Sequence, residues 1–521
     1  MRQLVDERGR RRGSTPRVAI IGAGVGGIAT AVKLRKAGIE GFTVFEKSDG
    51  AGGTWWDNRY PGCEVDVPSQ AYSFSFMNYD WTRTHAGASE LQQYIEAVID
   101  RFQLRPHLRF STAVAAIEWD RDACRWHLTT TSGEEHDFEV VVSAVGFLNV
   151  PRYPTWPGLD SFRGPTFHTA RWEDHDLRGK RVAVVGTGST AAQVVPAIAD
   201  EVGHLYVFQR EPGWVLPKNE RDLTAEERAR NLNPIRHKID RAKLFYEAIA
   251  INRVYDPESD EHKKFEAVGR KYIAKAIEDP EVQRAVTPTH PYGCKRPVLA
   301  TTFYPALNKP NVELVPRAVV SVTPTSVIDA DGTEREVDVL IFATGFHAAD
   351  FLRTFEVRGE HGMLRDAWAT RASAFLGITV PGFPNFFIQY GPNTNGGWSA
   401  MAQLERQAEV AVRVVRRMRR GRVRAVDTRP RALQQWVQWI DRMIAKHAPV
   451  MDGPCNNYFH SETGANVTQW PLSHAPYYAM TKLLPLFGFV SRRRNAIRSR
   501  LPARVRRRFG RRRRCGVRAS S

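Results

Sequence analysis

The sequence predicts an α/β fold built on two strand–helix–strand units, with an inserted helical segment. Two apolar segments of strand length, 17–21 and 181–185, are each followed by a glycine-rich turn and then by residues with helical spacing. A further strand-like segment closes each unit, at 42–46 and at 205–210. Strands that alternate with helices in this order predict parallel sheets. A length of 521 residues suits two to four domains of roughly 100–200 residues each.

The residues outside these two units have their own predicted secondary structure. Residues 219–281 are polar and charged with helical periodicity, which predicts the inserted helical segment; we assign it to 219–293. Residues 311–346 alternate in a strand-like way, and 404–420 have a helical pattern.

Composition favours an ordinary globular protein, because 42% of the residues are hydrophobic and 25% are charged. The five cysteines form no C-x-x-C pair, so a zinc site on paired cysteines and a dithiol redox centre are both unexpected. We therefore expect reduced thiols in a cytoplasmic protein. No apolar run reaches the ~18 residues of a transmembrane helix, and the basic extension 1–15 lacks the apolar stretch of a secretion signal.

Most of the formal charge of +19 belongs to the C-terminal end of the chain. Residues 491–521 contain 14 Arg and no Asp, Glu or Lys, so subtracting them leaves +5 for the rest. This distribution argues against a specific nucleic-acid-binding fold. A solvated, disordered terminus is the favoured interpretation of 491–521. Weak association with an anionic membrane, aided by the apolar residues 483–490, is the alternative.

Each unit carries a glycine turn suited to a dinucleotide. Between a strand and a helix, such glycines allow a tight turn and close approach of a pyrophosphate to the helix N-terminus. The first turn has Gly22, Gly24 and Gly27. The second has Gly186 and Gly188, with Ala191 as the third small residue; the neighbouring candidates for phosphate contacts are Thr187, Ser189, Thr190 and Gln193.

Opposite charges close the two units. Glu46 lies 24 positions after Gly22, and Arg210 lies 24 positions after Gly186. A carboxylate accepts hydrogen bonds from a ribose 2′-OH, whereas a guanidinium forms a charge-assisted contact with a 2′-phosphate. The first unit is therefore expected to hold FAD (or NAD) and the second NADPH. The expected boundaries are 16–150 with 346–490 for the FAD-binding domain, and 151–218 with 294–345 for the NADP-binding domain.

Phe162, Gly164, His168 and Trp172 follow the pattern F-x-G-x-x-x-H-x-x-x-W between the two units. This pattern resembles the fingerprint of the Baeyer–Villiger monooxygenases, a branch of the class B flavoprotein monooxygenases. The likeness extends from about residue 16 to 486. It includes four other segments, which are Gly52-Gly-Thr-Trp55, Asn58-Arg-Tyr-Pro-Gly62 with Asp66, Cys294-Lys-Arg-Pro297 and Ala343-Thr-Gly345.

The resemblance implies a reaction and roles for individual residues. NADPH would reduce FAD, O2 would give a C4a-peroxyflavin, and attack on a ketone would lead to an ester or lactone. Arg296 matches the family's active-site arginine and Asp66 its carboxylate partner. Lys295 would join Arg210 at the 2′-phosphate. Thr54, Trp55 and Tyr72 would lie beside the flavin, while His168 and Trp172 would hold the connection between the domains.

Other functions stay open at this point. A related enzyme that oxygenates an amine or a sulfide shares most of these motifs. A third hypothesis is a redox-inactive flavoprotein that acts through its basic terminus. The presence of Asp66 and Arg296 disfavours this hypothesis. Neither the ketone (linear, cyclic, aromatic or steroid) nor the oligomeric state follows from the sequence.

Overall fold

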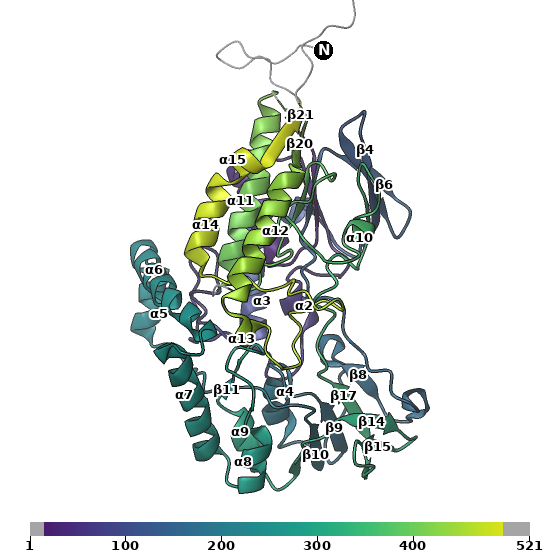
Figure 1. Cartoon of the computed structure of the whole chain (residues 1–521), viewed down its shortest axis with the longest axis vertical. Coiled ribbons are helices and arrows are strands. Elements are labelled where there is room, and N and C mark those ends of the chain that lie inside the picture. Colours follow the sequence, from purple (N-terminus) through teal and green to yellow (C-terminus); the bar gives the residue numbers. More distant parts are fainter. Residues whose placement is uncertain (1–14, 397–398, 422, 493–521) are drawn as a thin grey trace, which may run out of the picture.

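The computed structural model describes residues 15–396, 399–421 and 423–492. Two lobes lie along the long axis of the molecule (Figure 1), and each is built on a five-stranded parallel sheet. The expected α/β class with two Rossmann-like units is confirmed.

The first sheet forms the core of the upper lobe in Figure 1. Its order is β19 (Phe386–Ile388), β7 (Val140–Ser143), β1 (Val18–Ile21), β2 (Phe42–Phe45) and β3 (Leu108–Arg109). β1 and β7 are buried along their whole length, because both faces of the sheet are covered. Helices pack against one face, and strands within residues 114–138 pack against the other. The predicted helices are confirmed as α1 (Val25–Lys36) and α11 (Ala400–Arg419), which pack against each other.

The second sheet forms the core of the lower lobe and repeats this construction. Its order is β13 (Val312–Val315), β10 (His204–Phe208), β9 (Arg181–Val185), β17 (Val339–Phe342) and β8 (Thr166–His168). In both sheets the chain leaves the first strand (β1 or β9) through a glycine turn and returns on one side as the next strand. A later strand, β7 or β17, lies on the other side. Ligands bind at such a switch point, outside the carboxyl ends of the strands.

Smaller sheets decorate the two lobes. They are β18-β4-β5-β6 (Glu356–Arg358, Val114–Asp120, Arg125–Thr130, Glu135–Phe138), β14-β15-β16 (Val319–Val322, Ser326–Asp329, Glu334–Glu336), β11-β12 (Val215–Leu216, Val298–Leu299) and β20-β21 (Ala425–Thr428, Phe489–Arg492). The remaining helices outside the insertion are α2 (Thr54–Asp57), α3 (Ala88–Arg101), α4 (Ala191–Ile198), α9 (Phe303–Ala306), α10 (Leu364–Ala367), α12 (Pro430–Ala445), α13 (Ala448–Met451), α14 (His474–Leu483) and α15 (Pro485–Gly488).

The segment between β11 and β12 is helical, as its periodicity predicted. It contains α5 (Ala225–Leu232), α6 (Pro234–Ala250), α7 (Asp260–Ala276) and α8 (Pro280–Val286). Residues 1–14 of the basic extension and residues 493–521 lie outside the described residues. The predicted start of the C-terminal segment at 491 needs correction, because Ser491 and Arg492 pair with β20. Among the described helices, none combines the length and apolar character that crossing a membrane requires.

Two antiparallel segments connect the lobes. The Arg152 N–H donates to the Gly345 carbonyl (2.9 Å), and the His347 N–H donates to the Val150 carbonyl (3.0 Å). The buried His168, at the end of β8, lies with its Nε2 3.0 Å from the same Gly345 carbonyl. His168 therefore contacts the connection that the sequence assigned to it, whereas Trp172 packs edge-on against Phe167.

Candidate active site

A single cavity of about 1110 Å³ is lined by both glycine turns. It extends along the carboxyl ends of both parallel sheets, so both switch points face it. Residues of the loops 52–72, 210–213, 295–298 and 456–458 complete its wall.

Two glycines of the first turn leave no room for a side chain. Gly22 has a φ of +104°, and a Cβ there would lie 2.7 Å from the Ala144 carbonyl oxygen. A Cβ on Gly27 would lie 1.9 Å from the Gly22 carbonyl oxygen. Gly24 caps α1 without a side-chain hydrogen bond, so the N-terminus of this helix stays available to an anion.

Glu46 is held in place by the backbone around it. Its Oε2 accepts a hydrogen bond from the Ala23 N–H (2.6 Å), and its Oε1 accepts one from the Ser48 N–H (2.9 Å). The side chain is buried, yet it lines the cavity. Since each carboxylate oxygen has a second lone pair, Glu46 can still accept a ribose hydroxyl.

The second glycine turn is more open. Gly186 has a φ of +115°, and a Cβ there would lie 2.5 Å from the Ala343 carbonyl oxygen. A Cβ on Gly188, in contrast, would meet no atom within 4 Å. Thr190 caps α4 without a side-chain hydrogen bond, and Thr187 and Ser189 line the cavity beside it. The second turn therefore leaves space for a ligand that the protein itself does not fill.

The cations beside this turn differ in their partners. Arg210 is exposed and lines the cavity, and among the described residues it makes no hydrogen bond or ion pair. Lys295 forms an ion pair with Glu211 (2.6 Å). Burial lowers the pKa of Lys295 despite this pair. A phosphate that contacts Lys295 would therefore have to compete with Glu211, whereas Arg210 has no such competitor among the described residues.

Arg296 and Asp66 form an ion pair across the cavity wall. The Asp66 carboxylate holds the pKa of Arg296 well above its usual value. Burial opposes ionisation of Asp66, but the Arg296 guanidinium outweighs it and lowers the pKa of Asp66. The Arg296 side chain keeps 45% of its surface exposed, so the pair carries a permanent cation that remains accessible from the cavity.

The residues predicted to lie beside the flavin come together next to the first turn. Gly53 passes so close to Gly24 that a Cβ on Gly53 would lie 2.9 Å from the Gly24 Cα. Thr54 and Trp55 follow in α2, and the Trp55 Nε1 donates to the Tyr72 hydroxyl (3.1 Å). Burial raises the pKa of Tyr72 to about 12, so its hydroxyl stays protonated at neutral pH.

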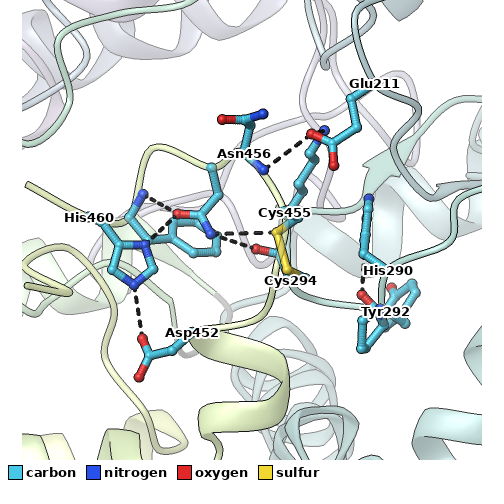
Figure 2. The surroundings of a disulfide bond; sticks show 12 residues. Glu211, His290, Tyr292, Cys294, Asp452, Cys455, Asn456 and His460 are labelled. Carbon is cyan, nitrogen blue, oxygen red and sulfur yellow. Dashed lines mark hydrogen bonds and ion pairs between the residues drawn. A yellow bond between two sulfur atoms is a disulfide. The ribbon is translucent and has the colours of Figure 1, made fainter. Parts of the chain in front are cut away.

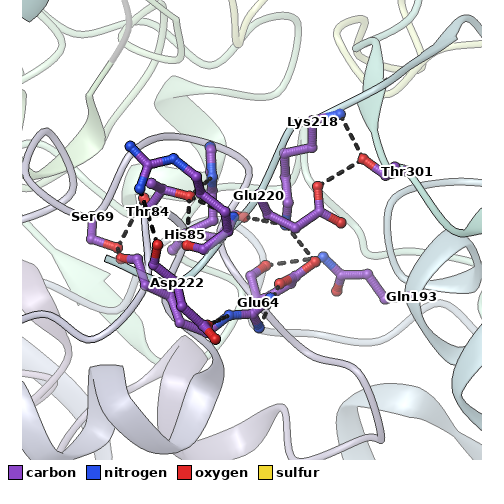
Figure 3. A network of polar contacts seen from close by, with 12 residues as sticks. Glu64, Ser69, Thr84, His85, Gln193, Lys218, Glu220, Asp222 and Thr301 are labelled. Atoms are coloured by element: carbon purple, nitrogen blue, oxygen red, sulfur yellow. Dashed lines mark hydrogen bonds and ion pairs between the residues drawn. The ribbon is translucent and has the colours of Figure 1, made fainter. Parts of the chain in front are cut away.

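A polar network between the lobes supports the Asp66 loop (Figure 3). Lys218 follows β11, and its fully buried Nζ pairs with Glu64 and donates to the Val65 carbonyl (3.0 Å). Burial and the nearby Lys218 ammonium lower the pKa of His85 to about 4. The network thus fixes the residues that immediately precede Asp66.

Gln193 belongs to this inter-lobe contact, which revises the role predicted for it. Its Oε1 accepts from the Tyr60 hydroxyl (2.8 Å), and its Nε2 donates to the Glu64 carbonyl (2.9 Å). Because both ends of the amide have partners in the other lobe, Gln193 is better explained as a bridge than as a phosphate ligand.

The expectation of reduced thiols is wrong for two cysteines. Cys294 and Cys455 form a disulfide (Figure 2) across a separation of 161 residues. Cys63 and Cys124 are free and buried, and Cys515 lies outside the described residues. No local spacing signals this disulfide, because the fold alone brings the two cysteines together.

Three further residues that line the cavity were not predicted from the sequence. Tyr390, with a φ of +56°, donates its hydroxyl to Asn395 Oδ1 (3.0 Å), and Tyr458 lines the same cavity. Arg317, just after β13, also lines it and pairs with Asp331. Of the three, only Arg317 could have been predicted from the sequence, because a basic residue that follows a buried strand lies at the ligand-binding edge of a parallel sheet.

The residues present fit two dinucleotides. Two helix N-termini without side-chain caps face the cavity, an acceptor stands at the end of β2, and a cation without a partner among the described residues stands just after β10. Two such sites that open into one cavity define a class of oxidoreductase in which a nicotinamide nucleotide and a flavin meet.

Comparison with known proteins narrows this class. The family model "Flavin-binding monooxygenase-like" matches residues 15–223. A Baeyer–Villiger monooxygenase of Streptomyces coelicolor is 40% identical over 90% of this chain and 91% of its own length. The crystal structure of cyclohexanone monooxygenase from Rhodococcus sp. Phi1 bound to NADP+ superposes with a TM-score of 0.81, at 32% identity, over 92% of this chain and 99% of that chain. The structure of OTEMO in complex with FAD and NADP gives a TM-score of 0.82, at 27% identity, over 92% and 99%.

The chain therefore belongs to the Baeyer–Villiger monooxygenase family. The resemblance predicted from the motifs is confirmed, as is the expected kind of enzyme, a flavoprotein monooxygenase with FAD and NADP(H) as cofactors.

Proposed function

We propose that this protein uses NADPH and O2 to insert one oxygen atom beside the carbonyl of a ketone, giving an ester or lactone. The observation that carries the proposal is the Arg296–Asp66 pair, which lines the same cavity as both dinucleotide turns.

The two lobes divide the cofactors between them in this proposal. Residues 16–150 and 346–490 hold FAD, with Gly22, Gly24 and Gly27 at the pyrophosphate and Glu46 at the ribose. Residues 151–218 and 294–345 hold NADPH, with Gly186 and Gly188 at the pyrophosphate and Arg210 at the 2′-phosphate. Residues 219–293 form a helical insertion that supplies no dinucleotide motif.

Bound FAD, reduced by NADPH, supplies the activation of O2. The protein must then stabilise negative charge on oxygen without donating a proton to it. Arg296 suits this task because a guanidinium remains charged at every working pH, and its pKa here is raised further by Asp66. Asp66 positions Arg296, and the Lys218–Glu64 pair supports the loop that carries Asp66.

The replacement Arg296→Ala tests this role. The variant should still be reduced by NADPH, because the replacement leaves Arg210 and the second glycine turn, the proposed NADPH contacts, unchanged. Ester formation should fall by about 100-fold or more, the usual effect of removing a donor that stabilises an oxyanion. Flavin bleaching under anaerobic NADPH and mass analysis of the product measure the two steps separately.

Two controls sharpen the test. Arg296→Lys keeps a positive charge without the planar fork and should retain part of the ester yield. A panel of cyclohexanone, a linear ketone, a thioether and a tertiary amine separates the ketone reaction from the alternative chemistry on sulfur or nitrogen. An unaltered lactone yield in Arg296→Ala refutes the assignment.

We further propose that the C-terminal end of the chain associates weakly with anionic membranes. Leu486 and Phe487 of α15 are 70% and 75% exposed, and Leu483 is 54% exposed. An exposed apolar group that precedes a strongly basic segment combines apolar burial with electrostatic attraction to anionic lipids. Removal of residues 493–521 should abolish sedimentation with phosphatidylserine vesicles at low salt. Equal sedimentation of the full-length and shortened proteins contradicts the proposal.

A further inference from the structure

The disulfide between Cys294 and Cys455 joins two segments of the active-site wall. Cys294 directly precedes Lys295 and Arg296, and Cys455 directly precedes residues 456–458. All of these following residues line the cavity. The cross-link therefore connects the loop that carries Arg296 to a segment 161 residues further along the chain.

Polar contacts fasten the same two segments (Figure 2). Asn457 Nδ2 donates to the Cys294 carbonyl (3.1 Å). Glu211 accepts from the Asn456 N–H (3.2 Å) and pairs with Lys295. These contacts involve half-buried or exposed groups, so each contributes modestly and together they leave the disulfide as the strong connection.

The loop around Cys455 is shaped to approach Cys294. A Cβ on Gly453 would lie 2.9 Å from the Cys294 Sγ, so a glycine is needed at this position. His460 Nε2 lies 2.9 Å from Asp452 Oδ1 and closes the loop behind the disulfide. Cys294 itself is fully buried, whereas Cys455 is half-buried. A reductant can therefore reach the disulfide from the Cys455 side.

We propose that the Cys294–Cys455 pair is a redox modification site that couples the efficiency of oxygen transfer to the thiol–disulfide state of the protein. In the oxidised form, the cross-link holds the Arg296 loop against residues 455–458. In the reduced form, these residues separate from the loop and Arg296 loses part of its positioning. The inference rests on the proposed function for its activity readout, but not for its structural readouts.

A small-molecule disulfide can serve as the oxidant that forms the Cys294–Cys455 bond. Two thiols lose two protons and two electrons as the S–S bond forms, and one oxidised glutathione becomes two molecules of glutathione. An excess of glutathione or another thiol reverses the step by exchange. Cross-links that open and close in this way are the usual kind in reducing compartments.

A bound metal ion is the competing explanation for these cysteines. The ligand atoms of His290, Cys294 and Cys455 lie within 4.8 Å of one another. Zn²⁺ binds cysteine as the thiolate, so Cys294 and Cys455 cannot both ligate it while the disulfide joins them. Metal content therefore distinguishes the two explanations.

The test begins with the purified full-length holoenzyme. Digestion without reductant, after alkylation of free thiols, should give a peptide pair that contains Cys294 and Cys455 and separates on reduction. Treatment with dithiothreitol should increase deuterium uptake in residues 452–460 about tenfold or more, since the segment then opens locally. The yield of ester per NADPH consumed should fall by about tenfold. This is less than the ~100-fold that a misplacement of ~1 Å can cost, because the ion pair with Asp66 still holds Arg296.

Two variants complete the test. Cys455→Ser, at the half-buried end, should behave like the reduced enzyme and should not respond to dithiothreitol. Cys124→Ser, a replacement of a free cysteine beside the sheet β18-β4-β5-β6, should behave like the unmodified enzyme.

Each result of this test either supports the proposal or overturns it. Absence of the linked peptide, stoichiometric zinc, or a Cys455→Ser variant with unchanged exchange and unchanged ester yield overturns the proposal. If no ketone is oxygenated, the proposed function fails, and the linked peptide and the exchange data still decide on the modification.

Discussion

The two dinucleotide units are built on the same plan. In the first, the Gly22 N–H donates to the Phe45 carbonyl (2.7 Å), and Gly22 packs against Ala144 after β7. In the second, the Gly186 N–H donates to the Phe208 carbonyl (3.0 Å), and Gly186 packs against the residue after β17. Each leading glycine thus fills the same place between three parallel strands.

The two units differ in the residues that surround the expected nucleotide. In the first unit, Gly24 is backed by Gly53, and Glu46 is buried with both oxygens hydrogen-bonded. In the second, Gly188 faces open space and Arg210 is exposed without a partner among the described residues. The first unit is organised in advance, as suits a cofactor that stays bound. The second keeps its binding groups accessible, as suits a nucleotide that must leave.

The largest effect is expected from the addition of one methyl group at a crowded position of the first turn, compared with the same change at an open position of the second. Gly27→Ala should abolish flavin retention or folding, because its Cβ would overlap the Gly22 carbonyl oxygen and the buried backbone cannot move aside; we expect a loss of about 3 kcal/mol or more. Gly188→Ala should leave the melting temperature unchanged and raise the KM for NADPH. The ratio of flavin to protein absorbance and thermal melts measure both. Equal melting temperatures for the two variants contradict the crowding described at Gly27.

Glu46→Gln tests the organisation of the first unit. Each carboxylate oxygen of Glu46 now accepts one hydrogen bond, from the Ala23 N–H or from the Ser48 N–H. A glutamine amide has only one oxygen, so one of these two N–H groups loses its partner. The free energy of unfolding should fall by about 1–3 kcal/mol. FAD should dissociate on dilution, as followed by flavin fluorescence. Full FAD occupancy at the lowest protein concentrations argues against a role for Glu46 at the ribose.

Arg210→Ala tests the second unit. Loss of a charge-assisted contact of about 1.5–3 kcal/mol should raise the KM for NADPH by roughly 10- to 150-fold and leave that for NADH nearly unchanged. Flavin content should not change. Arg210→Lys serves as the matched control and should retain most of the preference. Equal losses with NADPH and NADH count against the 2′-phosphate contact.

The smallest effect concerns the connection between the units. Burial lowers the pKa of His168 to about 4 in the folded protein, from 6.5. Between these values the unfolded chain binds more protons, so the stability is full above about pH 6.5 and falls toward pH 4. At pH 5.5 the loss from His168 is about 1 kcal/mol.

Chemical denaturation at pH 7 and at pH 5.5 measures this effect. His168→Gln should show a weaker pH dependence than the unmodified protein. Part of the dependence should remain, because burial also lowers the pKa of His85, His237, His447 and His474. An unchanged pH dependence in the variant assigns the effect to other groups.

Local patterns predicted the two units well. The segment 17–21 contains β1, and the helical pattern 404–420 lies largely within α11, because apolar periodicity reports which face of an element is buried. The sheet formed by β4, β5, β6 and β18 was missed. Its last strand, Glu356–Arg358, pairs with residues some 240 positions earlier, and such pairing leaves no mark in a short window.

The same limit applies to the candidate site. Arg296 and Asp66 were found through short motifs, and the structure brings them into contact. Gln193 was expected at a phosphate because it follows the second glycine turn, yet its amide turns to the other lobe. The partners of Lys295 and Cys294 were also missed, since each comes from a different part of the chain.

Sequence alone determined the two strand–turn–helix units, the acidic and basic residues that close them, and the family motifs between them. These features depend on the order of residues within some 30 positions, where backbone geometry and periodicity act directly. Tertiary structure decided which charges stay free for a ligand, which side chains bridge the lobes, and which cysteines meet. Those outcomes depend on burial and on distances between remote segments, which the chain acquires only when both lobes have folded against each other.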